Sequence, residues 1–583
     1  MKTSKNFLFA AVGLSLTNGI PVTAQNNIQD RKPNVIYVFP DQFRNHAMGF
    51  WGEKGFKEHV RFKPDPVITP NLNNFARESV VLTSAMSNCP LSSPHRGMLL
   101  SGMYPDGSGV PLNCNSDRPI SSLREDIECI GDVFKKNGYD CAYIGKLHVD
   151  FPTPNNPEAP GTYVNNDTPV WDAYTPKERR HGFDYWYSYG TFDIHKQPHY
   201  WDTDGKRHEI REWSPKHEAD KAIEYLENTG NVRDTSKPFF MIVSMNPPHS
   251  PYRTIDDVME EDYNLYKDIP LDKLLVRPNA NPQMEKAQCA PFYFASVTGV
   301  DREFGRILKA LKNLGLEENT IVVFSSDHGE TMCSQNTNDP KNSPYAESMN
   351  VPFLVRYPEK LKPRVEDRLL LSSPDIMPTV LGLAGLSRQI PETVQGTNFA
   401  PVISKEKNVP KLPSGILYLR NLNGEKNADG KIISYFPEAR GIKTERYTLA
   451  ISIDKQHNIK HIFFYVIFKI ISRITPYGLV RIFFFYFFKQ RDKCFLIDFF
   501  HWVTSKKRKP LYIIRLKILY YLVLGFLIKK LSIAKIPCFR IKALLTVMCA
   551  AAHKQGYPHS RSVCNIYPFY IRIIHYRHPS LSF

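Results

Sequence analysis

The stretch of the chain that decides the fold runs from Phe294 to Phe324 and reads FASVTGVDREFGRILKALKNLGLEENTIVVF. Its first part carries an apolar residue every three or four positions, as the buried face of a helix requires. Gly315 then supplies a helix stop, and the apolar run of residues 320–324 follows as a strand. A long helix that leads directly into a strand is one crossover unit of an α/β domain. The apolar positions of the helix are Val297, Val300, Phe304, Ile307, Leu308, Leu311 and Leu314.

Three further apolar runs fit the same architecture: Asn34–Phe39 (NVIYVF), Cys141–Ile144 (CAYI) and Phe239–Met245 (FFMIVSM). Short β-branched and aromatic runs that alternate with amphipathic stretches predict a largely parallel, buried sheet flanked by helices. Residues 151–235 are polar, Pro-rich and aromatic, and are more typical of a long excursion over the active face than of sheet. From residue 410 to 451 the pattern shortens, which predicts a small terminal subdomain.

The charge of the chain is divided unevenly along its length. Residues 456–583 contain 22 Lys and Arg but only two acids, a formal charge of +20. Residues 1–455 therefore hold 53 of the 75 basic and 56 of the 58 acidic residues, a charge of −3. Because the body is close to neutral, its charge gives no reason to expect nucleic acid as a partner.

The start of the chain has the organisation of an export signal. Lys2 and Lys5 form a charged start, Phe7–Leu16 is an apolar stretch, and Val22-Thr23-Ala24 is a small-residue cleavage site. We expect residues 1–24 to be a signal peptide and the mature protein to be exported, into the periplasm of a Gram-negative bacterium. The ten Cys include no CxxC pair, which indicates neither a zinc site nor a disulfide scaffold.

Polar residues stand directly after each predicted strand. The carboxyl ends of parallel strands meet at one edge of the sheet and leave a crevice where open α/β sheets bind ligands. One such residue is usually a turn former, but four sites in one sheet predict a functional crevice. The residues are Asp41 and Gln42, Lys146 and His148, His249, and Asp327 and His328.

The most specific segment is SSPHRGMLLSG, residues 92–102. Ser-x-Pro-x-Arg followed by Leu-Ser-Gly resembles the maturation signature of the type I sulfatases, in the alkaline-phosphatase superfamily. The resemblance extends over roughly residues 33–450, with the other motifs in the same order. In that family a Ser or Cys at the position of Ser92 is oxidised to formylglycine (3-oxoalanine), whose hydrate is the nucleophile.

The resemblance implies a mixed, mostly parallel α/β sheet of the alkaline-phosphatase type, flanked by helices, with a small C-terminal α+β subdomain. It places the catalytic domain in residues 25–405 and the start of the subdomain in residues 406–455. Residues 456–583 fit no part of the family pattern, so we expect the subdomain to be incomplete.

By similarity to the family, a divalent cation would be held by Asp41, Gln42, Asp327 and His328, together with the modified Ser92. Mostly oxygen donors favour Ca²⁺, with Mg²⁺ as the second choice. His328 is a softer donor than the Asn found in many relatives, which leaves the identity of the metal more open.

The family also implies roles for the cationic residues. Arg96, one helical turn beyond Ser92, would stabilise the hydrated formylglycine, while Lys146 and Lys341 would hold the sulfate. His249, in Asn-Pro-Pro-His-Ser-Pro, would be the general acid that protonates the departing sugar oxygen. His148, in Gly-Lys-Leu-His, would take the proton when the bound sulfate is expelled.

The substrate is indicated less strongly. Trp171, Trp186, Trp201 and Trp213 fall within 43 residues, among several Tyr. Aromatic faces suit sugar rings, so a glycan pocket is one interpretation, with His195 or His199 contacting hydroxyls. The other interpretation is a structural core for most of these rings.

The resulting hypothesis is a sulfatase acting on O-sulfate esters of a glycan, from a host glycosaminoglycan, a mucin or an algal polysaccharide. One alternative is a phosphoester hydrolase of the same superfamily, although phosphatase relatives lack the Pro and Arg that follow Ser92. A second is a catalytically impaired glycan-binding homologue. Because the nucleophile position is Ser and not Cys, the resemblance implies a radical maturase of an anaerobic bacterium as partner.

Residues 456–583 read as an aberrant tail. The longest apolar run, Ile518–Ile528, has 11 residues, whereas a membrane span needs about 20, so we expect no stable span. Unguarded aromatic runs such as Ile482–Phe488 are aggregation hazards. Translation of AT-rich DNA in a shifted frame gives this composition, so we interpret the tail as the product of a frameshift near codon 455.

Overall fold

The computed structural model describes residues 31–116, 118–152, 170–421, 423–426, 432–436, 438–453, 459–466, 485–490 and 493–498. The expected signal peptide and most of the tail lie outside these residues, so both stay predictions.

A ten-stranded mixed sheet forms the centre of the fold. Its strands are β1 (Asn34–Val38), β2 (Val80–Leu82), β4 (Asp140–Lys146), β5 (Tyr185–Tyr189), β6 (His199–Trp201), β7 (Arg207–Glu209), β8 (Phe239–Ser244), β9 (Thr320–Ser325), β11 (Phe353–Arg356) and β12 (Arg364–Glu366). The spatial order is β12-β2-β11-β9-β1-β8-β4-β5-β6-β7. The five strands from β9 to β5 run parallel, and β11 pairs antiparallel with both neighbours. The predicted mixed, mostly parallel α/β sheet is confirmed.

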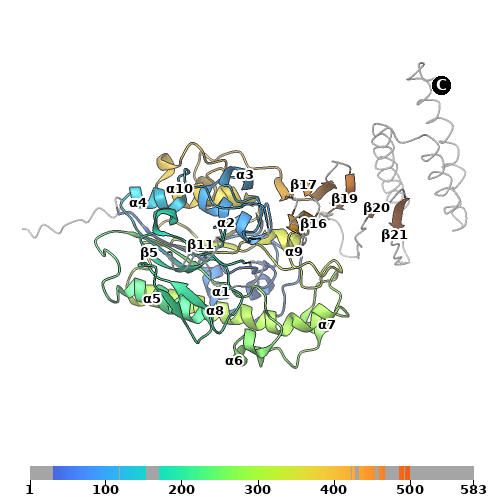
Figure 1. Cartoon of the computed structure of the whole chain (residues 1–583), viewed down its shortest axis with the longest axis horizontal. Coiled ribbons are helices and arrows are strands. Elements are labelled where there is room, and N and C mark those ends of the chain that lie inside the picture. Colours follow the sequence, from blue (N-terminus) through green and yellow to red (C-terminus); the bar gives the residue numbers. More distant parts are fainter. Residues whose placement is uncertain are drawn as a thin grey trace, which may run out of the picture. The chain divides into compact units, whose positions relative to one another are not determined.

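Helices cover both faces of this sheet (Figure 1). One face carries α2 (Ser92–Ser101), α4 (Ile130–Lys136) and α10 (Ile376–Leu383), and the other carries α1 (Pro70–Arg77), α5 (Ser214–Glu227) and α8 (Ala290–Asn313). Strand residues alternate between the two cores, since side chains point to opposite faces in turn.

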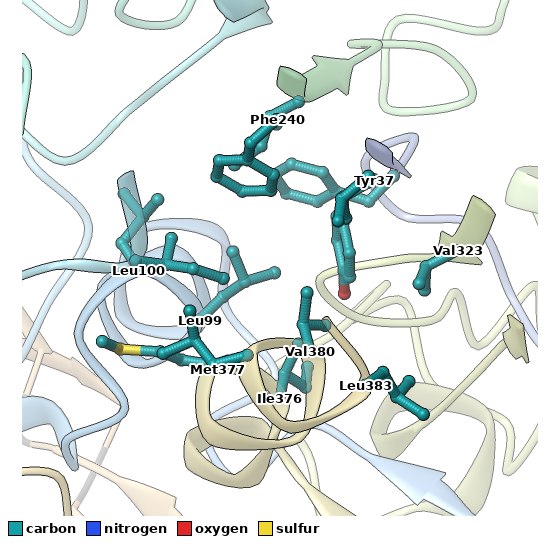
Figure 2. Close-up of a cluster of buried hydrophobic side chains, with 14 of the residues drawn as sticks. Tyr37, Leu99, Leu100, Phe240, Val323, Ile376, Met377, Val380 and Leu383 are labelled. Atoms are coloured by element: carbon teal, nitrogen blue, oxygen red, sulfur yellow. The ribbon is translucent and has the colours of Figure 1, made fainter. Parts of the chain in front are cut away.

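The core on the α2 and α10 side shows this alternation directly. Tyr37, Phe240 and Val323, from three adjacent strands, face Leu99 of α2 and Met377 of α10 (Figure 2). Their sequence neighbours on each strand belong to the opposite core. The strands are therefore apolar on both faces, which explains why they read as unbroken apolar runs.

The predicted strands and the long helix are observed within a few residues of their expected bounds. Helix α8 begins at Ala290, before the expected Phe294, because Pro291 is tolerated in a first helical turn. The prediction for residues 151–235 is wrong in part: β5 extends the parallel sheet beside β4, β6 and β7 continue it, and α5 follows. β5 and β6 lack a two-residue hydrophobic alternation because nearly all of their side chains are buried, and β7 is too polar and exposed to read as a strand.

A small antiparallel sheet forms the C-terminal subdomain, as expected. Its strands are β14 (Ile416–Arg420), β17 (Glu438–Lys443), β18 (Tyr447–Ile453) and β19 (Ile459–Val466), in that order. The Leu419 amide donates to the Asn88 carbonyl at 2.7 Å, which joins this sheet to the catalytic part of the chain. β19 falls inside the region interpreted as an aberrant tail.

The remaining α-helices and strands are short. The helices are α3 (Pro105–Ser108), α6 (Glu260–Tyr263), α7 (Leu271–Leu274), α9 (Ala346–Met349) and α11 (Ala400–Ile403). The strands are β3 (Ala85–Met86), β10 (Asn350–Val351) and β13 (Leu371–Ser372) in one sheet, and the hairpins β15 (Asn423–Lys426) with β16 (Ile432–Phe436) and β20 (Phe485–Gln490) with β21 (Lys493–Asp498). Within the described parts of the chain, no helix combines the length and the apolar composition that crossing a bilayer requires.

Candidate active site

The carboxyl ends of four parallel strands bring the sequence-predicted residues to one edge of the sheet. Asp41 follows β1, Lys146 ends β4, and Asp327 and His328 follow β9. The Asp41 amide donates to the Met245 carbonyl at 2.8 Å, which fixes the end of β1 against the end of β8. These polar side chains are almost completely buried. A buried group of ionisable side chains at a sheet edge marks a functional crevice.

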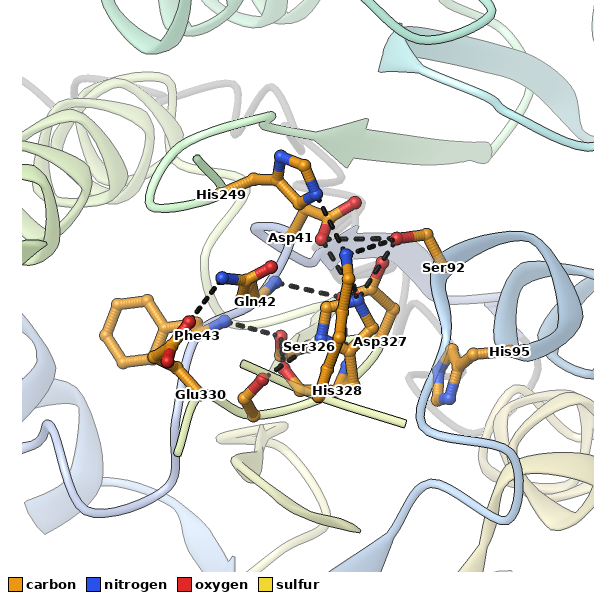
Figure 3. Close-up of polar contacts among 12 residues, drawn as sticks. Asp41, Gln42, Phe43, Ser92, His95, His249, Ser326, Asp327, His328 and Glu330 are labelled. Carbon is orange, nitrogen blue, oxygen red and sulfur yellow. Dashed lines mark hydrogen bonds and ion pairs between the residues drawn. The ribbon is translucent and has the colours of Figure 1, made fainter. Parts of the chain in front are cut away.

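Ser92 is the first residue of α2, and its hydroxyl points into this group (Figure 3). Its Oγ lies 3.1 Å from Nε2 of His328, 3.5 Å from Oδ1 of Asp41 and 3.4 Å from Nζ of Lys341. Arg96, four residues along the helix, faces the same crevice and is 1% exposed. The helix thus presents a hydroxyl and a guanidinium to the same group of charges.

Buried cations compensate the two carboxylates. Nη2 of Arg96 lies 3.2 Å from Oδ2 of both Asp41 and Asp327, and Nζ of Lys146 lies 2.8 Å from Asp41 Oδ2. Burial alone raises the pKa of Asp41, but the charges of Lys146, His249 and other neighbouring cations hold that pKa well below its usual range. Asp41 therefore keeps its negative charge inside the protein.

The donor set fits a divalent cation. Single ligand atoms of Asp41, Asp327 and His328 all lie within 4.8 Å of one another. The side-chain amide nitrogen of Gln42 donates hydrogen bonds to the Glu330 carboxylate and the Tyr252 hydroxyl. Among the residues that the structure describes, its buried Oε1 has no hydrogen-bond partner. Two carboxylates and an amide oxygen without a partner are donors that Ca²⁺ accepts. Burial lowers the pKa of His328 to about 4, so its ring is neutral and able to act as a ligand at pH 7.

His249 follows β8 and reaches the same group of side chains through Lys341. Its Nε2 is 2.9 Å from Nζ of Lys341, and its Nδ1 lies 2.7 Å from the Ser250 carbonyl. Oδ1 of Asp193 stands 3.4 Å from the same Nδ1. The Nδ1 proton is directed at acceptors, so Nε2 is the atom presented to the crevice. The ring tautomer suits a proton transfer at Nε2.

His148 is held differently. Its Nε2 lies 3.3 Å from the Cys114 carbonyl, and its ring is 6.2 Å from that of Trp171. Burial, followed by the charges of Lys146 and Arg96, lowers its pKa well below the usual range, so the ring is neutral. A neutral imidazole is ready to accept a proton, not to donate one.

Most of the aromatic cluster belongs to the core. Trp186, Trp201 and Trp213 are at most 2% exposed. The two His considered for sugar contacts are buried as well: Nε2 of His199 pairs with Asp172 at 2.7 Å, and Nδ1 of His195 lies 3.3 Å from the Asp257 carbonyl. Most of these rings therefore form part of the core, as the second interpretation of the sequence had it. Trp171 is only half-buried and stacks under the Arg118 guanidinium.

Sequence reasoning did not find several residues that support the site. Asn246 accepts from Lys146 Nζ at 2.9 Å and donates to Asp193 at 3.1 Å. Glu330 binds Gln42 and accepts from Lys286 Nζ at 2.8 Å. Asn246 stands three residues before His249, inside the Asn-Pro-Pro-His-Ser-Pro run, and Glu330 stands three residues after Asp327. No local pattern marked Asp193, because its contact with His249 arises only on folding.

The chain is similar to known proteins along most of its length. The family model "Sulfatase" matches residues 33–386, and "N-sulphoglucosamine sulphohydrolase, C-terminal" matches residues 340–462. An endo-4-O-sulfatase of Bacteroides thetaiotaomicron is 68% identical over 449 residues, which cover 77% of this chain and 87% of that protein. An ulvan-active sulfatase of Formosa agariphila is 32% identical over 444 residues, 73% of this chain and 74% of that protein.

A solved structure has the same fold. A protein from a study of the metabolism of multiple glycosaminoglycans by B. thetaiotaomicron superposes with a TM-score of 0.72 at 68% identity, covering 75% of this chain and 90% of that one.

The mixed sheet and the crevice at its edge define an α/β enzyme with a buried group of ionisable side chains and a candidate cation site. The chain belongs to the sulfatase family, the type I sulfatases of the alkaline-phosphatase superfamily. It is a sulfuric ester hydrolase, as the sequence predicted.

Proposed function

We propose that the chain removes an O-sulfate group from a sugar of a sulfated glycan, with Ser92 converted to formylglycine and Ca²⁺ held by Asp41, Gln42, Asp327 and His328. The observation that carries this proposal is the position of Ser92 Oγ, within 3.5 Å of His328, Asp41 and Lys341. A nucleophile there would lie beside the residues that would hold the ion and beside the cations that would hold the sulfate.

Each group supplies one part of the chemistry. A bound divalent cation lowers the pKa of an attacking hydroxyl and draws charge from the sulfate oxygens. A formylglycine hydrate supplies a hydroxyl that attacks sulfur and a second hydroxyl from which the aldehyde can reform. An unmodified Ser hydroxyl is a weak nucleophile at neutral pH.

The side chains of this protein perform the remaining tasks. Lys146 and Lys341 neutralise the sulfate oxygens and orient the ester in line with the attacking oxygen. With both ring nitrogens protonated, His249 donates the Nε2 proton to the departing sugar oxygen and becomes neutral, while its Nδ1–H keeps its hydrogen bond to the Ser250 carbonyl. Neutral His148 accepts the proton released when the aldehyde reforms.

A glycan is supported as the substrate class by two relatives. The names of the B. thetaiotaomicron and F. agariphila proteins refer to an endo-4-O-sulfatase and to an ulvan-active sulfatase. The proposal includes export to the periplasm, supported by the signal-like residues 1–24, and maturation by an anaerobic radical enzyme, supported by Ser at position 92.

Mass spectrometry of the Ser92 peptide tests the modification. Conversion of Ser to formylglycine removes two hydrogens, so we expect a loss of about two daltons in protein made with its maturase. Protein made without the maturase keeps Ser92 and releases sulfate near background. An active native preparation that carries unmodified Ser92 would refute the role of formylglycine.

The His249→Ala variant tests the mechanism. Loss of a general acid costs about 10²–10⁴-fold on a sugar sulfate, whose leaving oxygen needs a proton. An activated aryl sulfate needs no proton, so its hydrolysis should fall far less. Equal losses on both substrates would show that His249 is not the general acid. Phosphate esters assayed in parallel test whether the enzyme prefers sulfate esters over phosphate esters.

A further inference from the structure

A second hollow lies beside the active site, with a volume of about 1050 Å³. Its walls come from the segment after β8, from α6 and the chain leading into α7, from the first turn of α8, and from the segment that precedes Lys341. Helices α6 and α7 lie along α8 at this part of the molecule (Figure 1). The volume is at the upper limit of the roughly 300–1,000 Å³ typical of small-ligand pockets, which leaves room for more than one sugar.

The hollow begins where the proposed general acid stands. Ser250, the residue after His249, lines it, and so does Pro340, the residue before Lys341. Nε2 of His249 and Nζ of Lys341 are 2.9 Å apart. Since His249 donates to the departing oxygen, the sugar that carries this oxygen must lie on the His249 side. Ser250 and Pro340 place the hollow next to this position, within reach of the rest of the glycan attached to that sugar.

The lining has the chemistry of an anionic carbohydrate site. Tyr263 and Phe292 form a stacked pair, with ring centroids 4.4 Å apart and planes at 14°, and both are partly exposed. Aromatic faces of this kind pack against the apolar face of a sugar ring. Arg253 and Lys267 are exposed in the same lining and can pair with sulfate or carboxylate groups.

Other lining groups complete the polar character of the hollow. Asp268 and Glu285 offer acceptors for sugar hydroxyls. Lys286 connects the wall to the candidate cation site, because its Nζ binds Glu330, which in turn binds Gln42. A glycan bound in the hollow would therefore contact Lys286, which through Glu330 holds the proposed metal ligand Gln42.

We propose that this hollow binds the part of a sulfated glycan chain attached to the sugar that loses its sulfate, so that the enzyme recognises an oligosaccharide and not a single sugar. The proposal rests on the proposed function, because His249 sets the direction of the leaving group. A protein segment is the other possible occupant, and the test below separates the two.

Binding to the unmatured full-length chain, with Ser92 unmodified, tests the proposal without turnover. Isothermal titration with sulfated glycosaminoglycan oligosaccharides of two and six sugars should show about tenfold tighter binding of the longer one, the ratio that 1.4 kcal/mol gives. We test the double variant Tyr263→Ala/Phe292→Ala and the single variant Arg253→Ala, whose side chain is exposed. Each should weaken the binding of the six-sugar oligosaccharide alone, so that its affinity falls to that of the two-sugar one. The matched control Arg207→Ala, an exposed Arg on β7 outside the lining, should keep the length preference.

Wild-type affinity that does not depend on length, or variants that keep the wild-type length preference, would overturn the proposal and would favour a protein occupant. If the matured enzyme still releases sulfate from a disaccharide in that case, the proposed function stands without the hollow. A matured enzyme that releases sulfate from no ester would instead remove the proposed function, whatever the binding data show.

Discussion

Replacing Arg96 with Met tests how the buried charges of the active site are balanced. The guanidinium donates from Nη1 to the Lys146 carbonyl and the Ser244 hydroxyl, each at 2.7 Å. Its Nη2 lies 3.2 Å from a carboxylate oxygen of both Asp41 and Asp327. Met has a similar length but no charge, so the two carboxylates lose a shared partner at positions that water does not reach.

The expected loss of stability is large. Removing one member of a buried charge group costs about 3–5 kcal/mol, because the remaining charges stay desolvated without compensation. Calcium should reverse part of this loss, since a ligand that binds only the folded state stabilises it by about 4 kcal/mol at 1,000 times its Kd. We therefore expect a lower urea midpoint for Arg96→Met in EDTA, and a larger gain on adding Ca²⁺ than the wild type shows.

Intrinsic Trp fluorescence during urea unfolding measures both quantities, in EDTA and in millimolar Ca²⁺. Arg207→Met is the matched control: its ion pair with Glu209 at 3.1 Å is exposed, so the change should stay within about 0.5 kcal/mol. An Arg96→Met protein with the wild-type midpoint in EDTA would show that the carboxylates do not depend on Arg96. A Ca²⁺ response no larger than that of the wild type would contradict the shared site.

Two further predictions concern stability away from the active site. Asp301 of α8 accepts the amide hydrogens of two residues at the start of α1, at 3.1 and 2.6 Å. Asp301→Ala should therefore cost about 1–3 kcal/mol in thermal unfolding, and Asp301→Asn clearly less; equal effects would argue against the cap. Burial lowers the pKa of Lys443 to about 8, from the ordinary Lys value of 10.5. Between these two pH values the unfolded state binds more protons than the folded state. The contribution of Lys443 to the free energy of unfolding therefore rises with pH in this range. Lys443→Met should be more stable than the wild type at pH 7 and should lack that contribution, which urea midpoints at pH 7 and 10 would show; parallel pH dependence of the two proteins would refute it.

The sequence predicted those parts of the fold and site that local pattern determines. β1, β8 and β9 are apolar on both faces, so their runs could be recognised, and the residues after them lie where parallel strands place them. β5 and β6 were missed because their aromatic side chains are buried on both sides of strands that also contain polar residues, and β7 was missed because its three residues are polar and mostly exposed. Asp193 could not be found, because its partner His249 is 56 positions away and only the turn after β8 brings the two together.

The last prediction concerns the region interpreted as a frameshifted tail. β19 begins four residues beyond position 455 and pairs along β18, from Tyr447 opposite Val466 to Ile453 opposite Ile459. The ring of Phe463 lies 5.2 Å from that of Tyr345, at an edge-on angle of 81°. The match to the C-terminal family model also continues to residue 462. The first residues after the expected break therefore complete the small sheet, whatever their origin.

Two truncated chains separate the sheet from the rest of the tail. A chain that ends at residue 455 leaves the edge of β18 unpaired, and an exposed edge of this kind pairs with other molecules. We expect it to aggregate and to unfold at a lower temperature. A chain that ends at residue 466 keeps the pairing and loses most of the basic, aromatic segment. It should stay free of aggregates in light scattering and unfold at or above the temperature of the full chain. If the chain ending at 455 matches the one ending at 466, β19 adds nothing to the subdomain. If the chain ending at 466 unfolds at a lower temperature than the full chain, residues 467–583 contribute to the stability of the fold. Together with an unbroken reading frame on resequencing around codon 455, that result would overturn the frameshift interpretation.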